Sequence, residues 1–371
     1  MTLGKANYFC KMNLKRAVVI WLVCGLILVY FQIIIGGITR LTGSGLSITK
    51  WEIVTGSVPP LSEKAWIREF EKYKATPQYK KINVDMELGS VWNSGTFKFI
   101  YFWEYFHRLW AKSMGFIFLF PFIFFYWKKW LPATLKKDLG VVVGLAGLAA
   151  VFGWIMVASG LVNRPWVNAY KLSIHLCIGI GVFSYLLWGF LKYIHRGKSW
   201  EISGLVSNRF IWVLFVGVLI QLFLGGIMSG MKAALIYPTW PDIGGSFIPT
   251  EIFNTSNWTL KQFMEYDSGS FVFSLMHVLH RSVAYLLTVL VIWYALKYRI
   301  WNRGDRIGKS FKFVLLAIFL QVVIGIITLV NSIGIIPVFW GVLHQAMAVI
   351  FMGTFLIHLF YVRYESVVVE S

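Results

Sequence analysis

Long apolar stretches alternate with shorter polar ones along the entire chain. Eight of these stretches reach the roughly 20 residues that a helix needs to cross a membrane. They lie at about residues 17–38, 98–126, 139–162, 168–194, 210–230, 270–296, 310–331 and 337–362. Because 58% of the 371 residues are hydrophobic, a single soluble core with a wettable surface is excluded. The pattern therefore predicts an all-α polytopic membrane protein with eight transmembrane helices.

The net charge of +19 is carried mainly by the polar connections. Lysine and arginine cluster before the first stretch and in the second, fourth and sixth connections. By the positive-inside rule, these connections and both termini face the cytoplasm, and the long connections at about 39–97 and 231–269 lie outside. Such charges are topology signals and do not indicate a nucleic-acid surface. About sixteen residues precede the first stretch, too few for a cleaved transit peptide, which favours a bacterial inner membrane, although an organellar protein with its presequence trimmed would look alike.

Two sequence motifs recur between the halves of the chain. Gln32-Ile-Ile-Ile-Gly36-Gly37-Ile returns as Gln221-Leu-Phe-Leu-Gly225-Gly226-Ile, with a weaker echo from residue 321 to residue 325. Residues 104–108 in the second stretch are answered by residues 277–281 in the sixth. Four helices return the chain to its starting side, so the repeats are parallel. We predict two pseudo-symmetric four-helix bundles, formed by residues 1–197 and 198–371.

Four histidines lie inside four different apolar stretches. His107 and His175 are 68 residues apart, and His280 and His344 are 64 apart. An imidazole within a membrane is costly unless it is ligated or hydrogen-bonded. All four fall in the outer layer, one pair in each predicted bundle. Two histidines on facing helices suit a haem iron better than zinc, which needs three or four converging protein ligands.

The residues beside these histidines carry further chemistry. Arg108 and Arg281 directly follow their histidines and are candidate partners for haem propionates, or else arginines that reach to the membrane interface. His195 and His358 have no counterpart in the other half, and we interpret both as structural residues.

Glu104 breaks the symmetry between the two sites. It lies three residues before His107, on the same helix face, whereas His277 occupies the matching place before His280. A carboxylate beside one site only indicates that this site performs chemistry that needs a proton acceptor or a stabilised cation. The alternative is an interfacial carboxylate paired with a basic residue. His277 is an alternative iron ligand to His280, which we favour because it aligns with His107.

The outer connections have their own features. Trp66, Phe70 and Tyr73 recur at helical spacing and predict an amphipathic helix that covers the bundle as a lid or membrane anchor. Both long outer connections lack cysteine, and we expect packing roles without disulfides for the three cysteines present: Cys10, Cys24 and Cys177.

Taken together, these motifs resemble the haem A synthase family over nearly the whole chain. The resemblance is carried by the segments Gly36 to Ser47, Glu104 to Arg108, Ser173 to Leu176, Tyr237 to Pro241, His280 to Arg281 and Leu343 to Gln345. The absence of a cysteine pair from the outer connections departs from one bacterial branch. The long first connection is similar to the mitochondrial and proteobacterial branch.

The resemblance implies an oxidoreductase that converts the C8 methyl group of haem O to a formyl group by successive hydroxylations. Haem A for cytochrome oxidase would be the product. It implies that His280 and His344, with Arg281, hold one haem b. His107 and His175, with Arg108, would bracket the substrate haem O. Glu104 matches a carboxylate that matters for the family's reaction.

Two rival functions remain at this stage. A di-haem b electron carrier would use the same four histidines but would need no carboxylate at one site. A transporter would need ionisable residues near the bilayer midplane, and none lies deeper than the outer layer. Candidate partners are haem O, haem O synthase (protohaem farnesyltransferase), an electron-transfer protein, lipid and a second copy of the chain, with no nucleic acid.

Overall fold

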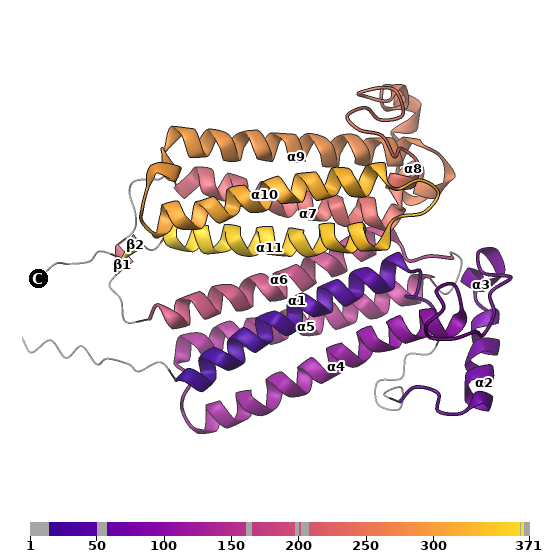
Figure 1. Cartoon of the computed structure of the whole chain (residues 1–371), viewed down its shortest axis with the longest axis horizontal. Coiled ribbons are helices and arrows are strands. Elements are labelled where there is room, and N and C mark those ends of the chain that lie inside the picture. The colour runs from indigo at the N-terminus through magenta and orange to yellow at the C-terminus, as the bar shows by residue number, and fades with distance from the viewer. Residues whose placement is uncertain are drawn as a thin grey trace, which may run out of the picture.

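A computed structural model describes residues 15–49, 58–160, 165–196, 200–201, 208–363 and 365–366. Eight long helices run side by side through the molecule (Figure 1) and are long and apolar enough to cross a membrane. They are α1 (Arg16–Leu41), α4 (Phe97–Trp127), α5 (Ala133–Gly160), α6 (Ala169–Ile194), α7 (Asn208–Met231), α9 (Phe271–Lys297), α10 (Arg306–Val330) and α11 (Val338–Arg363). The predicted fold class and the eight predicted spans are confirmed.

The short elements gather at the two ends of the helix bundle. The first long connection contains α2 (Glu63–Lys74) and α3 (Pro77–Lys81). The second contains α8 (Leu260–Met264) and the 3-10 turns η2 (Ala233–Leu235), η3 (Thr250–Ile252), η4 (Thr255–Asn257) and η5 (Tyr266–Ser268). Figure 1 shows α2, α3 and α8 at one end. At the other end, strands β1 (Trp200–Glu201) and β2 (Glu365–Ser366) pair antiparallel, and η6 (Ile300–Asn302) links α9 to α10.

Helix contacts follow the same scheme in both halves. In the first, α1 packs on α4, α5 on α6 and α1 on α6; in the second, α7 packs on α9, α10 on α11 and α7 on α11. Between the halves, α1 packs on α11, α6 on α7 and α6 on α11. The counterparts are α1 and α7, α4 and α9, α5 and α10, and α6 and α11. Exchanging each helix with its counterpart leaves this scheme unchanged, which supports the predicted repeat. The contact scheme alone does not establish the repeat, which stays a prediction. The predicted boundary between residues 197 and 198 lies outside the described residues.

The seam between the halves forms the main core. Its buried side chains come from α1, α6, α7, α9, α10 and α11, and include Ile33, Ile180, Ile211 and Val349. Within the most apolar part of each helix, 67% of α11 is buried but only 6% of α4 and of α5. Helix α11 is therefore central, and α4 and α5 present most of their apolar surface to lipid.

Polar residues set the helix ends where hydropathy alone did not. Helix α5 begins at Ala133, six residues before the predicted stretch, and its first two turns include Asp138, which is buried and pairs with Lys192 of α6 at 2.7 Å. Asn168 caps α6 by accepting hydrogen bonds from the amides of Tyr170 and Lys171. Charged residues that belong to a helix but lower its hydropathy were missed by the apolar count.

Helix α2 confirms the predicted amphipathic helix. Its Phe70 and Tyr73 are buried against Phe97 and Tyr101 at the outer end of α4. Burial raises the pKa of Tyr73 to about 12, so its phenol stays neutral and hydrogen-bonds to Gln78 at 3.2 Å. The helix therefore lies over the N-terminal end of α4, and its role as a lid stays a prediction.

Candidate functional site

A large cavity opens in the first half between α1, α4, α5 and α6. Its volume is about 1120 Å³, slightly above the roughly 300–1,000 Å³ that is typical of small-molecule and cofactor sites. Glu104, His107 and Arg108 line it from α4, and His175 lines it from α6. The structure thus brings together the four residues that the sequence assigned to the substrate site.

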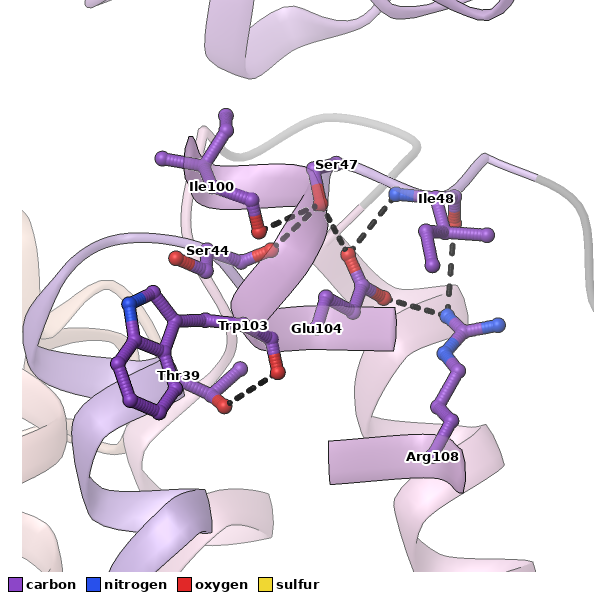
Figure 2. A network of polar contacts seen from close by, with 8 residues as sticks. All are labelled: Thr39, Ser44, Ser47, Ile48, Ile100, Trp103, Glu104 and Arg108. Carbon is purple, nitrogen blue, oxygen red and sulfur yellow. Dashed lines mark hydrogen bonds and ion pairs between the residues drawn. The ribbon is translucent and has the colours of Figure 1, made fainter. Parts of the chain in front are cut away.

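Glu104 is held by three hydrogen-bond donors (Figure 2). Its Oε2 accepts from the Ser47 hydroxyl at 2.7 Å and from the Ile48 amide at 2.8 Å, and its Oε1 pairs with the Arg108 guanidinium. Only 3% of its side chain is exposed. The sequence also allowed a carboxylate at the membrane interface that pairs with a basic residue. Glu104 does pair with Arg108, but it is buried at the cavity wall. The donors fix both oxygens and stabilise the charged carboxylate.

Each of the four predicted histidines packs against a glycine of a neighbouring helix. A Cβ built on Gly36 would lie 3.1 Å from His107 Nε2, and one on Gly153 would lie 3.1 Å from His175 Cε1. In the second half, the corresponding distances are 3.2 Å from Gly225 to His280 and 2.7 Å from Gly325 to His344. A Cβ at Gly325 would force the His344 ring to shift, and one at the other three positions would press on the imidazole by a few tenths of an ångström. Glycine thus lets the four rings pack closely on the neighbouring helices.

The second glycine of the repeated motif has a different role. A Cβ on Gly37 would lie 3.0 Å from the Gln345 side chain of α11, and one on Gly226 would lie 2.6 Å from the Ser173 hydroxyl of α6. Gln345 donates to the Ile33 carbonyl at 2.7 Å across the seam. The first glycine of each pair thus faces a histidine of its own half, and the second allows close packing against the other half.

Glutamine side chains contact the two histidines of the second half. Gln221 Nε2 lies 3.1 Å from His280 Nδ1, and Gln321 Nε2 lies 3.2 Å from His344 Nδ1. Both glutamine oxygens are buried without a hydrogen-bond partner. The same amide nitrogens lie 3.3 Å from His280 Nε2 and 3.4 Å from His344 Nε2, so each glutamine faces both nitrogens of its imidazole. Two imidazoles, one from α9 and one from α11, are a donor set that suits a haem iron.

The first half differs in its support of the histidines. Gln32 donates to the backbone carbonyl of His107 at 3.3 Å and does not contact its ring. The Nδ1 atom of His175 is buried without a hydrogen-bond partner among the described residues. The ring edge that carries this atom faces α5, where a Cβ built on Gly153 would lie 3.6 Å from Nδ1. The two halves thus differ in how they support their histidines.

His277 and Arg281 hold the second outer connection. His277 Nε2 lies 2.9 Å from the Ala233 carbonyl, and its Nδ1 lies 3.1 Å from Arg281 Nη2. Arg281 also donates to the carbonyls of Thr239, at 2.9 Å, and Asp242, at 2.7 Å. Both ring nitrogens of His277 have protein partners, which favours His280 as the iron ligand. Sequence reasoning missed this loop-holding role, because the partners are backbone carbonyls.

The remaining histidines and cysteines have structural surroundings. His195 contacts the Leu191 carbonyl at 2.9 Å, and His358 lies between the Tyr294 and Ser310 hydroxyls. Within the described ranges, no three His, Cys, Asp or Glu side chains gather as a metal cluster. Cys24 and Cys177 are free thiols, and Cys10 lies outside the described residues.

Fold and sites together define a class: polytopic helical membrane proteins whose paired intramembrane histidines suit haem iron. The chain belongs to the cytochrome oxidase assembly protein family, whose profile matches residues 19–356.

Relatives named haem A synthase match nearly the full length of the chain. The Flavobacterium psychrophilum protein is 35% identical over 92% of this chain and 97% of its own length. Those of a Bradyrhizobium species and Brucella suis are each 35% identical, over 90% and 93% of this chain and 88% and 91% of their own lengths.

Proposed function

We propose that the protein is a haem A synthase, an oxidoreductase that converts the C8 methyl group of haem O to the formyl group of haem A. The observation that carries the proposal is the placement of Glu104 in one cavity with His107 and His175. The relatives named haem A synthase support it, because the match to this chain covers at least 88% of the length of each. In each of two successive hydroxylations, the carbon takes a hydroxyl group from water and gives up two electrons to an electron-transfer partner and two protons to solvent. The resulting hydrated aldehyde loses water.

The two halves have different roles in this proposal. His107 and His175 bracket the substrate haem O in the cavity of the first half. His280 and His344 hold one haem b in the second half, where it supplies one-electron transfer. Gln221 and the other supporting glutamine fix the orientation of these imidazoles.

Glu104 is the group that acts on the substrate. Its carboxylate lies at the cavity wall, accepts a proton or stabilises positive charge that develops beside the C8 methyl group, and is held in place by Ser47 and Ile48. The second half has His277 in this position, and both nitrogens of that ring are engaged by protein. The asymmetry supports the proposal that the chemistry takes place in the first half.

The sidedness follows from the charge pattern. The end that carries β1 and β2 faces the cytoplasm of a bacterium, with both termini, and the end that carries α2 and α8 lies outside its inner membrane. Haem O synthase supplies the substrate, an electron-transfer protein exchanges electrons with the site, and a second copy of the chain is a candidate partner.

Pigment extraction tests the proposal directly. The chain is produced in a membrane together with haem O synthase, purified, and its haems are separated by chromatography. Haem A or haem O together with one equivalent of haem B supports the synthase. Two equivalents of haem B alone, with no conversion of haem O, would instead identify a di-haem electron carrier.

A further inference from the structure

Two cations from different halves of the chain meet at the outer end of the large cavity. Arg40 lies in the last turn of α1, and Lys232 directly follows α7. Both line the cavity of about 1120 Å³ and also the adjoining groove of about 1030 Å³. They lie close enough for the charge of Arg40 to act on Lys232.

In the part of the chain that the structure describes, neither cation has an acidic partner. Among the described residues, no carboxylate forms an ion pair with Arg40 or Lys232. Burial lowers the pKa of Lys232, and Arg40 lowers it further. Two neighbouring positive charges without a counter-charge repel each other, so the site is electrostatically complementary to an anion.

The backbone conformation at Lys232 also supports a role for its side chain. Its φ of 54° lies in the left-handed region, at the position after a helix where glycine is the usual residue. A lysine there carries a conformational cost that glycine would avoid. The position therefore favours the lysine side chain for a reason other than the turn itself.

The arginines that the sequence assigned to propionates are already engaged. Arg108 pairs with Glu104, and Arg281 donates to the carbonyls of the second outer connection. Lys112, also at the cavity wall, lies one helical turn beyond Arg108 in the direction away from the outer end. The charge available at the outer end is that of Arg40 and Lys232.

Arg40 lies at the same height in the membrane as Glu104. The residues that precede them, Thr39 and Trp103, are joined by a hydrogen bond of 3.1 Å from the threonine hydroxyl to the tryptophan carbonyl (Figure 2). A ligand carboxylate bound at Arg40 is thereby placed in the layer of the Glu104 carboxylate. In haem O, the C8 methyl group and one propionate share a pyrrole ring, so fixing that propionate also fixes the methyl group.

We propose that Arg40 and Lys232 bind the propionate carboxylates of the substrate haem and so orient its C8 methyl group toward Glu104. This inference rests on the proposed function. The site is completed by both halves of the chain, since Arg40 comes from the first and Lys232 from the second. Substrate binding at this place couples the position of the substrate to the seam.

Porphyrin binding tests the proposal without relying on turnover. The purified full chain, with haem b in place, is titrated with ferric protoporphyrin IX and with its dimethyl ester, and the second equivalent is followed by visible absorbance. The variants are Arg40→Gln and Lys232→Gly, and Lys261→Met in α8 is the matched control. Lys232→Gly removes the charge while relieving the backbone, so weaker binding is not attributable to misfolding.

The wild type and the control are expected to prefer the diacid to the ester. Each variant should lose about tenfold in affinity for the diacid, as expected for one charge-assisted hydrogen bond, and keep its affinity for the ester. A variant that keeps the wild-type ratio of diacid affinity to ester affinity would overturn this inference. It would leave the proposed function intact, since the wild type still binds the second porphyrin. A wild type that binds no second porphyrin and leaves haem O unconverted would overturn the proposed function itself.

Discussion

Replacing Glu104 should loosen the turn that follows α1, because this carboxylate holds the turn to α4. The Ile48 amide donates to Glu104 at 2.8 Å and the Ser47 hydroxyl at 2.7 Å, and the Arg108 side chain is 16% exposed. Glu104→Gln keeps an acceptor for Ile48 but leaves Arg108 without its anion. Removing one partner of a buried ion pair costs about 3–5 kcal/mol, and the lower end applies because Arg108 also donates to the Ile48 carbonyl.

Glu104→Ala should cost more, because it also leaves the Ile48 amide without its acceptor, whereas the Ser47 hydroxyl still has the Ser44 carbonyl at 2.9 Å. An unsatisfied donor of this kind adds about 1–3 kcal/mol. Hydrogen exchange of the segment around Ile48, measured by mass spectrometry in detergent, reports this local stability. Protection should fall in the order wild type, Gln, Ala, by about a factor of ten for each 1.4 kcal/mol.

The matched control is Glu69→Gln. Glu69 pairs with Lys72 on the exposed face of α2, and such a surface pair contributes about 0–1 kcal/mol. Exchange near Ile48 should therefore stay at the wild-type rate in this variant. Unchanged protection of Ile48 in Glu104→Ala would refute the reasoning, because it would mean that the carboxylate does not hold the turn.

Two further predictions concern the second half. Gly325→Ala puts a Cβ 2.7 Å from the His344 ring and should reduce the bound haem b and shift its absorption spectrum, whereas Gly144→Ala, with open space around its Cβ, should leave both unchanged. Equal haem b content in the two variants would contradict the packing argument. In the second outer connection, burial raises the pKa of Glu251, but hydrogen bonds from Ser274 and Tyr237 outweigh it and hold the pKa below 4.5. The stabilisation that the charged Glu251 carboxylate gives to this connection is thus complete above pH 4.5 and is lost as the pH falls through the lowered pKa. Proteolysis of the connection should therefore accelerate at low pH in the wild type. Glu251→Gln should remove that dependence, and a variant that kept it would show that another group is responsible.

Periodicity and hydropathy were enough for the helices, because the membrane imposes one length and one composition on every span. The same reasoning found α2 from Phe70 and Tyr73, whose spacing reports the buried face. It placed the start of α5 late, since Asp138 and its neighbours depress hydropathy although they belong to the helix. Charged first turns are invisible to a count of apolar residues.

The site was predictable where the repeat exposed it. The four histidines and Glu104 stood out because the halves could be compared, and the structure gathers Glu104, His107 and His175 at one cavity. The partners of Glu104 were not predictable, because Ser47 and the Ile48 amide lie 56 or more residues away and approach only through the fold.

The repeated glycines were visible but unexplained in the sequence. Only the structure shows that Gly36 and Gly225 face histidines, whereas Gly37 and Gly226 face the other half. Arg40 was overlooked for a related reason. It belongs to the quoted motif, but its significance depends on Lys232, which lies 192 residues further along the chain.

The central claim is that the first half transforms haem O while the second half holds a resident haem b. The most direct test is the haem content of the purified Glu104→Gln chain, produced together with haem O synthase and compared with the wild type. We predict one equivalent of haem B with an unchanged spectrum, retained haem O and no haem A. Haem A at the wild-type level in this variant would contradict the account.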